Sequence, residues 1–489
     1  MAKGAVWMVL FKFTERGLGL ISTIILARLL LPADFGLIAM AVSIIAVLEL
    51  LNSFGFDTVL IQNPDANRSH YDTAWTFNVI FGTASSLILF LLASPAAAFY
   101  DEPRLEMVID FLAIGTFIQG LGNVGVVAFR KELEFNKEFK FLVAKKLISF
   151  CITVPLAFIL KNYWALVIGM LAGKSAGMAL SYLVHPYRPR FSLAARHELF
   201  QFSKWLLLNN LLFFLRFRSA HFIIGKTAGT HALGLYTIAY EISNLPTTEL
   251  IAPINRAVYP GYAKMSADKA SLRQSFLNVI AIITLFALPA GTGIAAIASP
   301  LVEVVLGTKW MDAVPLIQIL AFFGILTAIQ TNTGYIYLAL GRPRVTTLLS
   351  GLSVLLLIPF LLWLTSRNGA IGAAWAYLVT ALVMTPPNFI FIMRQLGIKL
   401  EHLLSILWRP ISATLAMFLI VNQTVEFLSF LPDNFRALAQ LAAGIVAGGV
   451  SYSVILLVLW FVSSKPVGAE RMLLDKLLPR IPVFSRLGK

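Results

Sequence analysis

The sequence predicts an all-α integral membrane protein with about 14 transmembrane helices. Two observations predict this class: 58% of the 489 residues are hydrophobic, and only 13% are charged. A soluble domain carries about 25% charged residues, and a water-soluble fold could not cover so much apolar surface. The third observation is that apolar stretches of spanning length recur along the whole chain with short connections between them. A soluble enzyme with a single membrane anchor is therefore excluded.

The individual spans follow from length, because a helix needs about 20 mainly apolar residues to cross a bilayer. No connection between them is long enough to fold as a separate domain. The predicted spans lie at roughly 5–30, 36–60, 74–98, 106–129, 139–160, 163–184, 203–225, 233–258, 274–298, 313–340, 345–365, 370–393, 403–421 and 437–463.

A weak internal repeat organises these spans. Residues 27–28 match 225–226, and residues 36–41 match 234–239, both at a separation of 198 residues. In each copy one helix ends in a small residue and a cation, and Gly-Leu opens the next helix. Duplicated halves of transporters leave such traces, and chance similarity between apolar helices is the alternative.

The repeat predicts two six-helix lobes related by pseudo-two-fold symmetry, followed by two C-terminal helices. The expected divisions are 1–200 for an N-lobe with spans 1–6, 201–400 for a C-lobe with spans 7–12, 401–463 for spans 13 and 14, and 464–489 for a basic cytoplasmic tail.

The net charge of +15 would suggest a nucleic-acid partner in a soluble chain. Here basic loops account for it, and no nucleic acid is expected. With the N-terminus inside, few basic loop residues fall outside: Arg104, Lys161, Lys226, Lys309, Arg367 and Arg436. Both termini are therefore expected to be cytoplasmic. The single cysteine, Cys151, rules out an intrachain disulfide and a cysteine metal cluster. Neither a metal nor another cofactor is expected.

Charged residues inside the spans are informative because charge in the bilayer is costly unless it is paired or faces water. Four of them near helix ends are expected to snorkel to the interface: Arg28, Lys145, Lys204 and Arg409. In the first span, Lys12, Glu15 and Arg16 share one helical face. Lys12 and Glu15 can pair at i, i+3, which leaves Arg16 to meet an anion. The alternative is a self-neutralising structural cluster.

Other cations lie in the sixth to eighth spans. Lys174 lies beside a GxxxGxxxG ridge at 169–177, which permits close helix packing. It is either a ligand group or the partner of a carboxylate across the interface. Arg216 and Arg218 differ by about 200° around a helix, so a straight helix cannot aim both into one cavity. Arg256 lies in the eighth span, which Pro246 is expected to bend.

The polar interior also contains amides and carboxylates. Gln119 and Asn123 share a face of the fourth span. Four carboxylates are candidates for coupling to a proton or sodium gradient, with a structural salt bridge as the alternative for each: Glu15, Glu49, Asp57 and Glu241. Arg and Lys suit phosphate, and amides and aromatic residues suit sugars. An anionic amphipathic ligand fits this set, whereas a simple cation does not.

Several segments then indicate a family. They are ARLLLPADFGLIAMA (27–41), GFDTVLIQ (55–62), FYDEPRL (99–105), FRKELEFNKEFK (129–140), NYWALVIG (162–169), YRPRFS (187–192), GLYTIAYEISNLP (234–246), VYPGYAKM (258–265) and YLALGRP (337–343). In order and spacing they resemble the polysaccharide transporter family, which contains the Wzx-type flippases. That family belongs to the multidrug/oligosaccharidyl-lipid/polysaccharide exporter superfamily.

The resemblance implies a bilobal transporter of the bacterial inner membrane. The implied substrate is an undecaprenyl-diphosphate-linked oligosaccharide, delivered from the cytoplasmic to the periplasmic leaflet by alternating access for O-antigen, capsule or exopolysaccharide synthesis. Arg16 matches one arginine of the cationic cavity in related flippases of peptidoglycan precursors. Ser22 and Thr23 replace other charges there, so Lys174, Arg216, Arg218 and Arg256 would have to compensate.

The implied partners are membrane lipids, a polysaccharide polymerase and chain-length proteins, around a monomer. Three other functions stay open. A multidrug exporter of the same superfamily needs a cavity dominated by carboxylates, and a glycosyltransferase or polymerase needs larger outer loops. A purely structural assembly partner predicts dispensable cavity charges. No enzyme activity is expected.

Overall fold

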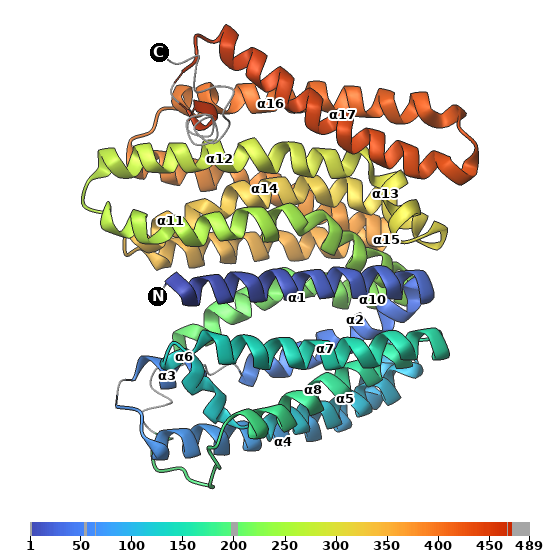
Figure 1. The fold of residues 1–489 in the computed structure, drawn as a ribbon, viewed down its shortest axis with the longest axis vertical. Helices are drawn as coiled ribbons and strands as arrows, with labels where there is room; N and C mark the ends of the chain where they lie inside the picture. The colour runs from blue at the N-terminus through green and yellow to red at the C-terminus, as the bar shows by residue number, and fades with distance from the viewer. Residues whose placement is uncertain (1, 53–55, 64, 197–203, 467, 472–489) are drawn as a thin grey trace. The chain divides into compact units, whose positions relative to one another are not determined.

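The computed structural model describes residues 2–52, 56–63, 65–196, 204–466 and 468–471. Within these ranges every element of regular secondary structure is a helix (Figure 1). The principal helices of the first half of the chain are α1 (Ala2–Leu29), α2 (Pro32–Asn52), α3 (Phe56–Gln62), α4 (Arg68–Tyr100), α5 (Arg104–Gly120), η1 (Val124–Val127), α6 (Ala128–Lys131), α7 (Phe135–Leu160), α8 (Trp164–Val184) and α10 (Lys204–Leu245). Those of the second half are η2 (Pro246–Ile251), α11 (Ala252–Lys264), α12 (Lys269–Ala296), α13 (Ala298–Val305), η3 (Thr308–Ala313), α14 (Val314–Ala339), α15 (Pro343–Leu396), α16 (Leu400–Phe427), η4 (Leu428–Phe430) and α17 (Asp433–Val462).

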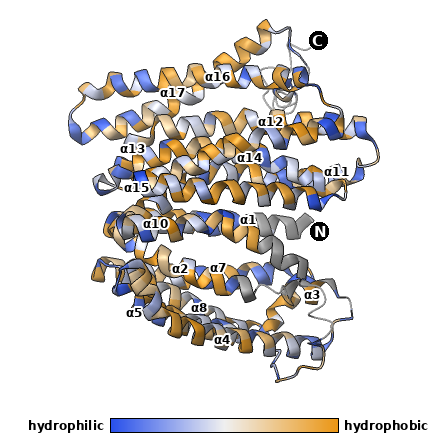
Figure 2. Ribbon diagram, turned by 180° about the vertical axis from the view of Figure 1, so that it is seen from behind, coloured by the Kyte–Doolittle hydropathy of each residue, from blue (hydrophilic) through white to orange (hydrophobic). Residues whose placement is uncertain are grey.

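The described part of the chain contains nine helices long and apolar enough to cross a membrane, and one bent pair makes a tenth. Figure 2 shows apolar residues along the long helices and polar residues concentrated at helix ends and connections. This confirms the predicted all-helical membrane class.

Two glycines let single long elements cover more than one predicted span. α15 has 54 residues and changes direction at Gly369, where φ is 56° and ψ is −138°. It therefore contains both the eleventh and the twelfth predicted spans. α10 has 42 residues and breaks in the same way at Gly229, where φ is 78°. Positive φ values of this kind are open to glycine because it lacks a Cβ.

Two predicted spans are interrupted. The fourth consists of α5 and the segment Val124–Lys131, which are bent by 68° relative to each other. The eighth begins in α10, passes through the π-helical η2 and continues in α11. η2 starts at Pro246, which cannot donate a backbone hydrogen bond. Pro246, which is expected to bend the eighth span, is the residue at which the α-helix gives way to this π-helical segment.

The chain divides into two compact units, Met1–Gly234 and Leu235–Lys489, so the boundary falls inside α10 just after its break. In the first unit, α4 packs on α5, α7 packs on α8, and α8 also contacts α5. In the second unit, α14 packs on α15, α16 packs on α17, and α12 contacts both α14 and α16.

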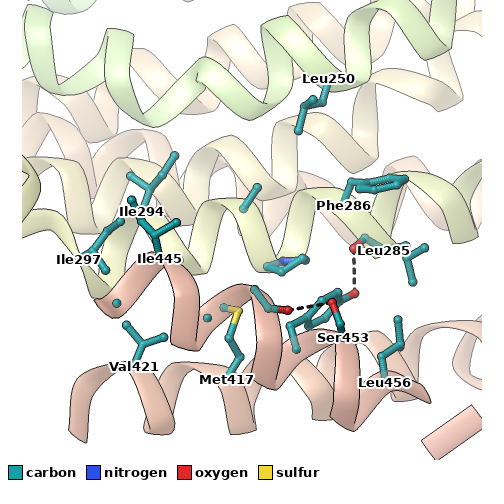
Figure 3. Close-up of a pocket in the computed structure, with 17 residues that line it drawn as sticks. Leu250, Leu285, Phe286, Ile294, Ile297, Met417, Val421, Ile445, Ser453 and Leu456 are labelled. Atoms are coloured by element: carbon teal, nitrogen blue, oxygen red, sulfur yellow. Dashed lines mark hydrogen bonds between the residues drawn. The ribbon is translucent and has the colours of Figure 1, made fainter. Parts of the chain in front are cut away.

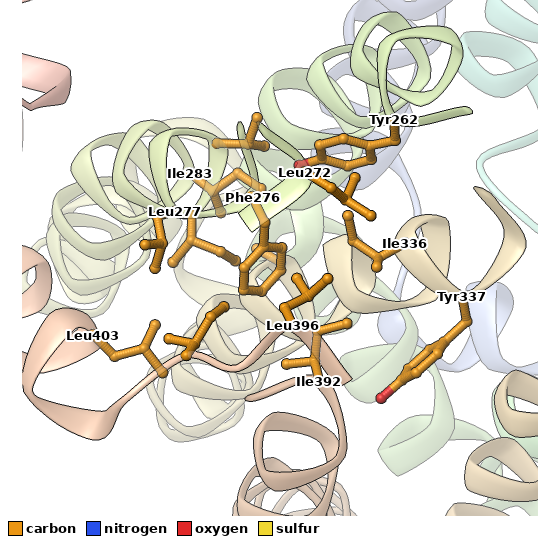
Figure 4. Packing of buried hydrophobic residues seen from close by; sticks show 14 of the residues in the cluster. Tyr262, Leu272, Phe276, Leu277, Ile283, Ile336, Tyr337, Ile392, Leu396 and Leu403 are labelled. Carbon is orange, nitrogen blue, oxygen red and sulfur yellow. The ribbon is translucent and has the colours of Figure 1, made fainter. Parts of the chain in front are cut away.

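One buried cluster of the second unit joins α11, α12, α14, α15 and α16 (Figure 4). Phe276 and Ile283 lie two turns apart on the same face of α12. Ile336 of α14 and Leu396 of α15 belong to the same cluster, and all four side chains are buried. Since lipid is as apolar as these side chains, close packing rather than exclusion of water holds such helices together.

In the first unit, the connection after α8 is bound along the start of α4. The carboxylate of Asp72, which is only 7% exposed, accepts a hydrogen bond from the backbone N–H of Arg190 at 2.9 Å and another from the hydroxyl of Tyr187. Two threonine hydroxyl oxygens accept further backbone N–H groups, Ser192 to Thr76 (3.0 Å) and Ala195 to Thr73 (3.2 Å). Hydrogen bonds therefore hold the segment 187–195 against the start of α4.

Candidate functional site

The glycine ridge of α8 receives a polar stripe of α7. A Cβ added at Gly169 would lie 1.8 Å from Oγ1 of Thr153, and one at Gly173 would lie 3.1 Å from Ser149. One helical turn further, a Cβ at Gly177 would lie 3.1 Å from the Lys145 side chain. The absence of side chains on the ridge therefore creates the room for this stripe. The predicted close packing at 169–177 is confirmed.

Lys174 lies on α8 between these glycines and reaches α5. Its ammonium donates a hydrogen bond to the hydroxyl of Thr116 at 3.3 Å. Its stem passes 3.1 Å from the place where a Cβ on Gly115 would lie. The ammonium of Lys145 repels that of Lys174, and the carboxylate of Glu49 on α2 attracts it. The structure thus brings together three charged groups from α2, α7 and α8.

The charges of α1 follow the predicted local arrangement. Lys12 and Glu15 form an ion pair at 2.7 Å, and both side chains are well exposed. The predicted i, i+3 pairing is confirmed. Arg16, one turn beyond Lys12, is half-buried. Glu15 is therefore already paired with a cation.

The two arginines of α10 have different surroundings. The guanidinium of Arg216 lies over the ring of Phe217, 5.7 Å from its centroid. Arg218 acts electrostatically on His221, which is 8% exposed. Both arginines are half-buried. Their different neighbours agree with the expectation that one helix cannot aim both into a single cavity.

The amides of the predicted fourth span have separate environments. Asn123 is 2% exposed, and both donors of its side chain are engaged, with the carbonyl oxygens of Ser181 (3.3 Å) and Tyr187 (2.8 Å). Its side-chain oxygen accepts from the backbone of Gly125. This arrangement caps η1 and leaves no donor for a ligand, so we omit Asn123 from the proposed site. Gln119 on α5 is exposed.

The remaining predicted residues are spread over the chain. Glu49 is exposed, and Asp57 has a side chain outside the described part. Glu241 and Arg256 belong to the second unit, where Glu241 is half-buried and Arg256 is exposed.

An apolar pocket of about 510 Å³ lies in the second unit between α12, α16 and α17 (Figure 3). Its lining includes Phe286 and Ile294 of α12, Met417 of α16 and Ile445 of α17. The hydroxyl of Tyr452 is engaged by the carbonyl of Leu285 at 2.7 Å, so the wall offers little polarity. This pocket was not predicted from the sequence, in which α16 and α17 look like ordinary spans. The glycines at 444–449 of α17 were the feature that could have indicated it.

Arg409 corrects one expectation. It does not snorkel, because it is 4% exposed and lies 3.4 Å from the carboxylate of Glu470, which is 7% exposed. Glu470 follows α17 and folds back so that its neighbour Ala469 packs on α12, α16 and α17. Lys145 also departs from the snorkelling expectation, because its side chain is half-buried against α8. Arg28 is exposed as expected, and the side chain of Lys204 lies outside the described part.

Long apolar helices with cations held among them define the class of this protein as a polytopic membrane transporter. Among solved structures, the fold is similar to "Lipid II flippase MurJ, inward closed conformation", with a TM-score of 0.74, 12% identity and coverage of 92% of this chain and 99% of that chain. It is also similar to an inward-facing MATE family multidrug resistance transporter, with a TM-score of 0.61, 16% identity and coverage of 78% and 94%. At these identities the comparison shows the shared fold.

The sequence comparison identifies the family. The model described as "Polysaccharide biosynthesis protein" matches residues 25–315, which is more than half of the chain, and the chain belongs to that family. It is 26% identical to the lipopolysaccharide biosynthesis protein WzxC of Escherichia coli K12, over 83% of this chain and 84% of that protein. It is also 26% identical to the succinoglycan biosynthesis transport protein ExoT of Rhizobium meliloti, over 96% and 94%. The predicted family and the prediction of a transporter rather than an enzyme are confirmed.

Proposed function

We propose that this protein moves an undecaprenyl-diphosphate-linked oligosaccharide repeat unit from the cytoplasmic to the periplasmic leaflet of the bacterial inner membrane. The observation that carries the proposal is the half-buried ammonium of Lys174, held by Thr116 inside a unit of apolar helices. A cation placed there is costly unless an anion or water meets it. A diphosphate supplies that anion, and the names of WzxC and ExoT associate relatives of this chain with polysaccharide synthesis.

The proposed mechanism is alternating access between two lobes built on the sequence repeat. The diphosphate and the glycan enter between the lobes, and the prenyl tail stays in lipid. Arg16 and Arg218 hold the diphosphate together with Lys174, while Gln119, Lys12, Arg216 and Arg256 are further candidates for contact with the substrate. The apolar pocket of the second unit suits hydrocarbon rather than this charged headgroup, because its wall is almost entirely apolar.

The proposed orientation has both termini in the cytoplasm, because the basic loop residues then face inward. Coupling to a proton or sodium gradient would use Glu49, Glu241 or Asp57. Glu15 is a further candidate, with its ion pair to Lys12 as the structural alternative. Membrane lipids, a polysaccharide polymerase and chain-length proteins remain the proposed partners of a monomeric transporter.

The test is the distribution of lipid-linked oligosaccharides in a strain depleted of this protein. The lipids are extracted and identified by mass spectrometry, and their exposure on each leaflet is probed in sealed vesicles of known orientation. Accumulation of one complete repeat unit on the cytoplasmic leaflet would support the proposal and identify the glycan. Normal delivery of that unit to the periplasmic leaflet would overturn it and favour a drug exporter or an assembly partner.

A further inference from the structure

Lys145 lies in an unusual place for a lysine of a spanning helix. It is in the middle third of α7, and its ammonium nitrogen lies 3.4 Å from the point where a Cβ on Gly177 would be. The side chain is half-buried. Among the described residues, its ammonium forms neither a hydrogen bond nor an ion pair. The fold therefore makes room for this cation without neutralising it.

Lys174 extends from the same stretch of α8. Gly177 is three residues further along that helix, so the two positions are neighbours on one helical face. The two positive charges act on each other, and each repels the other. Thr116 holds Lys174 in this position from α5.

The carboxylates of the first unit do not balance this pair. Glu49 attracts Lys174, but no carboxylate in the described ranges lies within ion-pair distance of either lysine. Two ammonium groups among apolar helices are unfavourable without a counter-charge. The location therefore favours an anionic ligand.

The chemistry of the groups narrows the ligand class. Each ammonium offers three donors and no acceptor, and lysine binds phosphate as a compact point charge. Phosphate oxygens can accept from both lysines at once.

We propose that Lys145 and Lys174 form a two-lysine site for phosphate oxygens at the junction of α5, α7 and α8, with Thr116 as the positioning residue. Glu49 of α2 attracts Lys174 without forming an ion pair with it. The ligand is a phosphate-containing headgroup, which comes either from the transported lipid-linked diphosphate or from an anionic membrane lipid. Only the first of these sources rests on the proposed function.

The test uses the full-length protein purified in detergent and two probes. Inorganic pyrophosphate binding is measured by calorimetry, and retention of phosphatidylglycerol is measured by native mass spectrometry. We expect K145M and K174M each to weaken binding by about tenfold or more. K146M is the matched control, because Lys146 is adjacent on α7 but exposed, and it should bind as the wild type does. K145R, which keeps the charge, should restore most of the binding.

The outcomes separate the sources of the anion and the two proposals. Loss of pyrophosphate binding supports a site for the diphosphate, and loss of phosphatidylglycerol alone supports a site for a membrane lipid. Wild-type binding of both probes by K145M and K174M overturns the two-lysine site, even if depletion supports flipping. Conversely, normal delivery after depletion overturns flipping, even if the site binds pyrophosphate. If the methionine variants are not monodisperse, comparison of K145Q with K145R decides in the same way.

Discussion

Gly36 of α2 and Gly234 of α10 pack reciprocally against each other's helix. A Cβ on Gly36 would lie 1.8 Å from the carbonyl oxygen of Thr230, and a Cβ on Gly234 would lie 1.8 Å from the carbonyl oxygen of Pro32. Positions 32 and 230, like positions 36 and 234, are 198 residues apart, which is the separation of the sequence repeat. The glycines of the repeat are therefore required by a backbone approach.

Replacing either of these glycines should destabilise the protein. Any Cβ would overlap a backbone carbonyl, so G36A and G234A must separate α2 from α10, and overpacking of this kind costs about 1–3 kcal/mol or more. The measurement is the thermal transition of the detergent-solubilised protein. G19A is the control, because nothing lies within 4 Å of a Cβ at Gly19. Equal melting of G36A and wild type would contradict the close approach.

The cations of the proposed anion site should be essential for transport. R16A and R218A are expected to abolish glycan export while the protein stays in the membrane, because a diphosphate would lose its counter-charges. Export is measured by complementation of the depleted strain, and membrane content by immunoblot. K137A is the control, since Lys137 is exposed and pairs with its neighbour Glu134. Normal export by both arginine variants would remove them from the site.

The carboxylate of Asp72 should hold the connection between α8 and α10. D72A leaves the hydroxyl of Tyr187 and the backbone N–H of Arg190 without their acceptor, and each such loss costs about 1–3 kcal/mol when buried. We expect faster hydrogen exchange in residues 187–195. D65A is the control, because Asp65 is exposed. Unchanged exchange in D72A would show that the other hydrogen bonds, with Thr73, Thr76 and Asn123, suffice to hold the connection.

The buried pair of Arg409 and Glu470 should behave differently from an exposed pair. E470Q leaves a buried guanidinium without its counter-charge, which costs about 3–5 kcal/mol. The double variant R409M/E470M removes both charges and should recover most of that loss. Stability is read from thermal unfolding in detergent. D433N, which breaks the exposed pair of Asp433 and Arg436, should change stability by less than about 1 kcal/mol.

The sequence predicted local features of the site well. Lys12 and Glu15 are three residues apart on one helix, so their pairing follows from helical geometry alone. The close packing at 169–177 likewise follows from glycine spacing. Lys145, Asn123 and Arg409 were misjudged, because their neighbours are Gly177, Ser181 with Tyr187, and Glu470, all distant along the chain. No periodicity within one helix reports such neighbours.

The sequence alone determined that the protein is a helical membrane protein, because lipid requires long apolar segments whose backbone groups are satisfied internally. It also determined which charges must enter the membrane, since those residues stand inside such segments. Only the tertiary structure decided which charges are neutralised: Arg409 is paired, whereas Lys145 has no counter-charge among the described residues. The physical reason is that the cost of a buried charge depends on groups brought near it by helix packing, and that packing joins residues far apart in the chain.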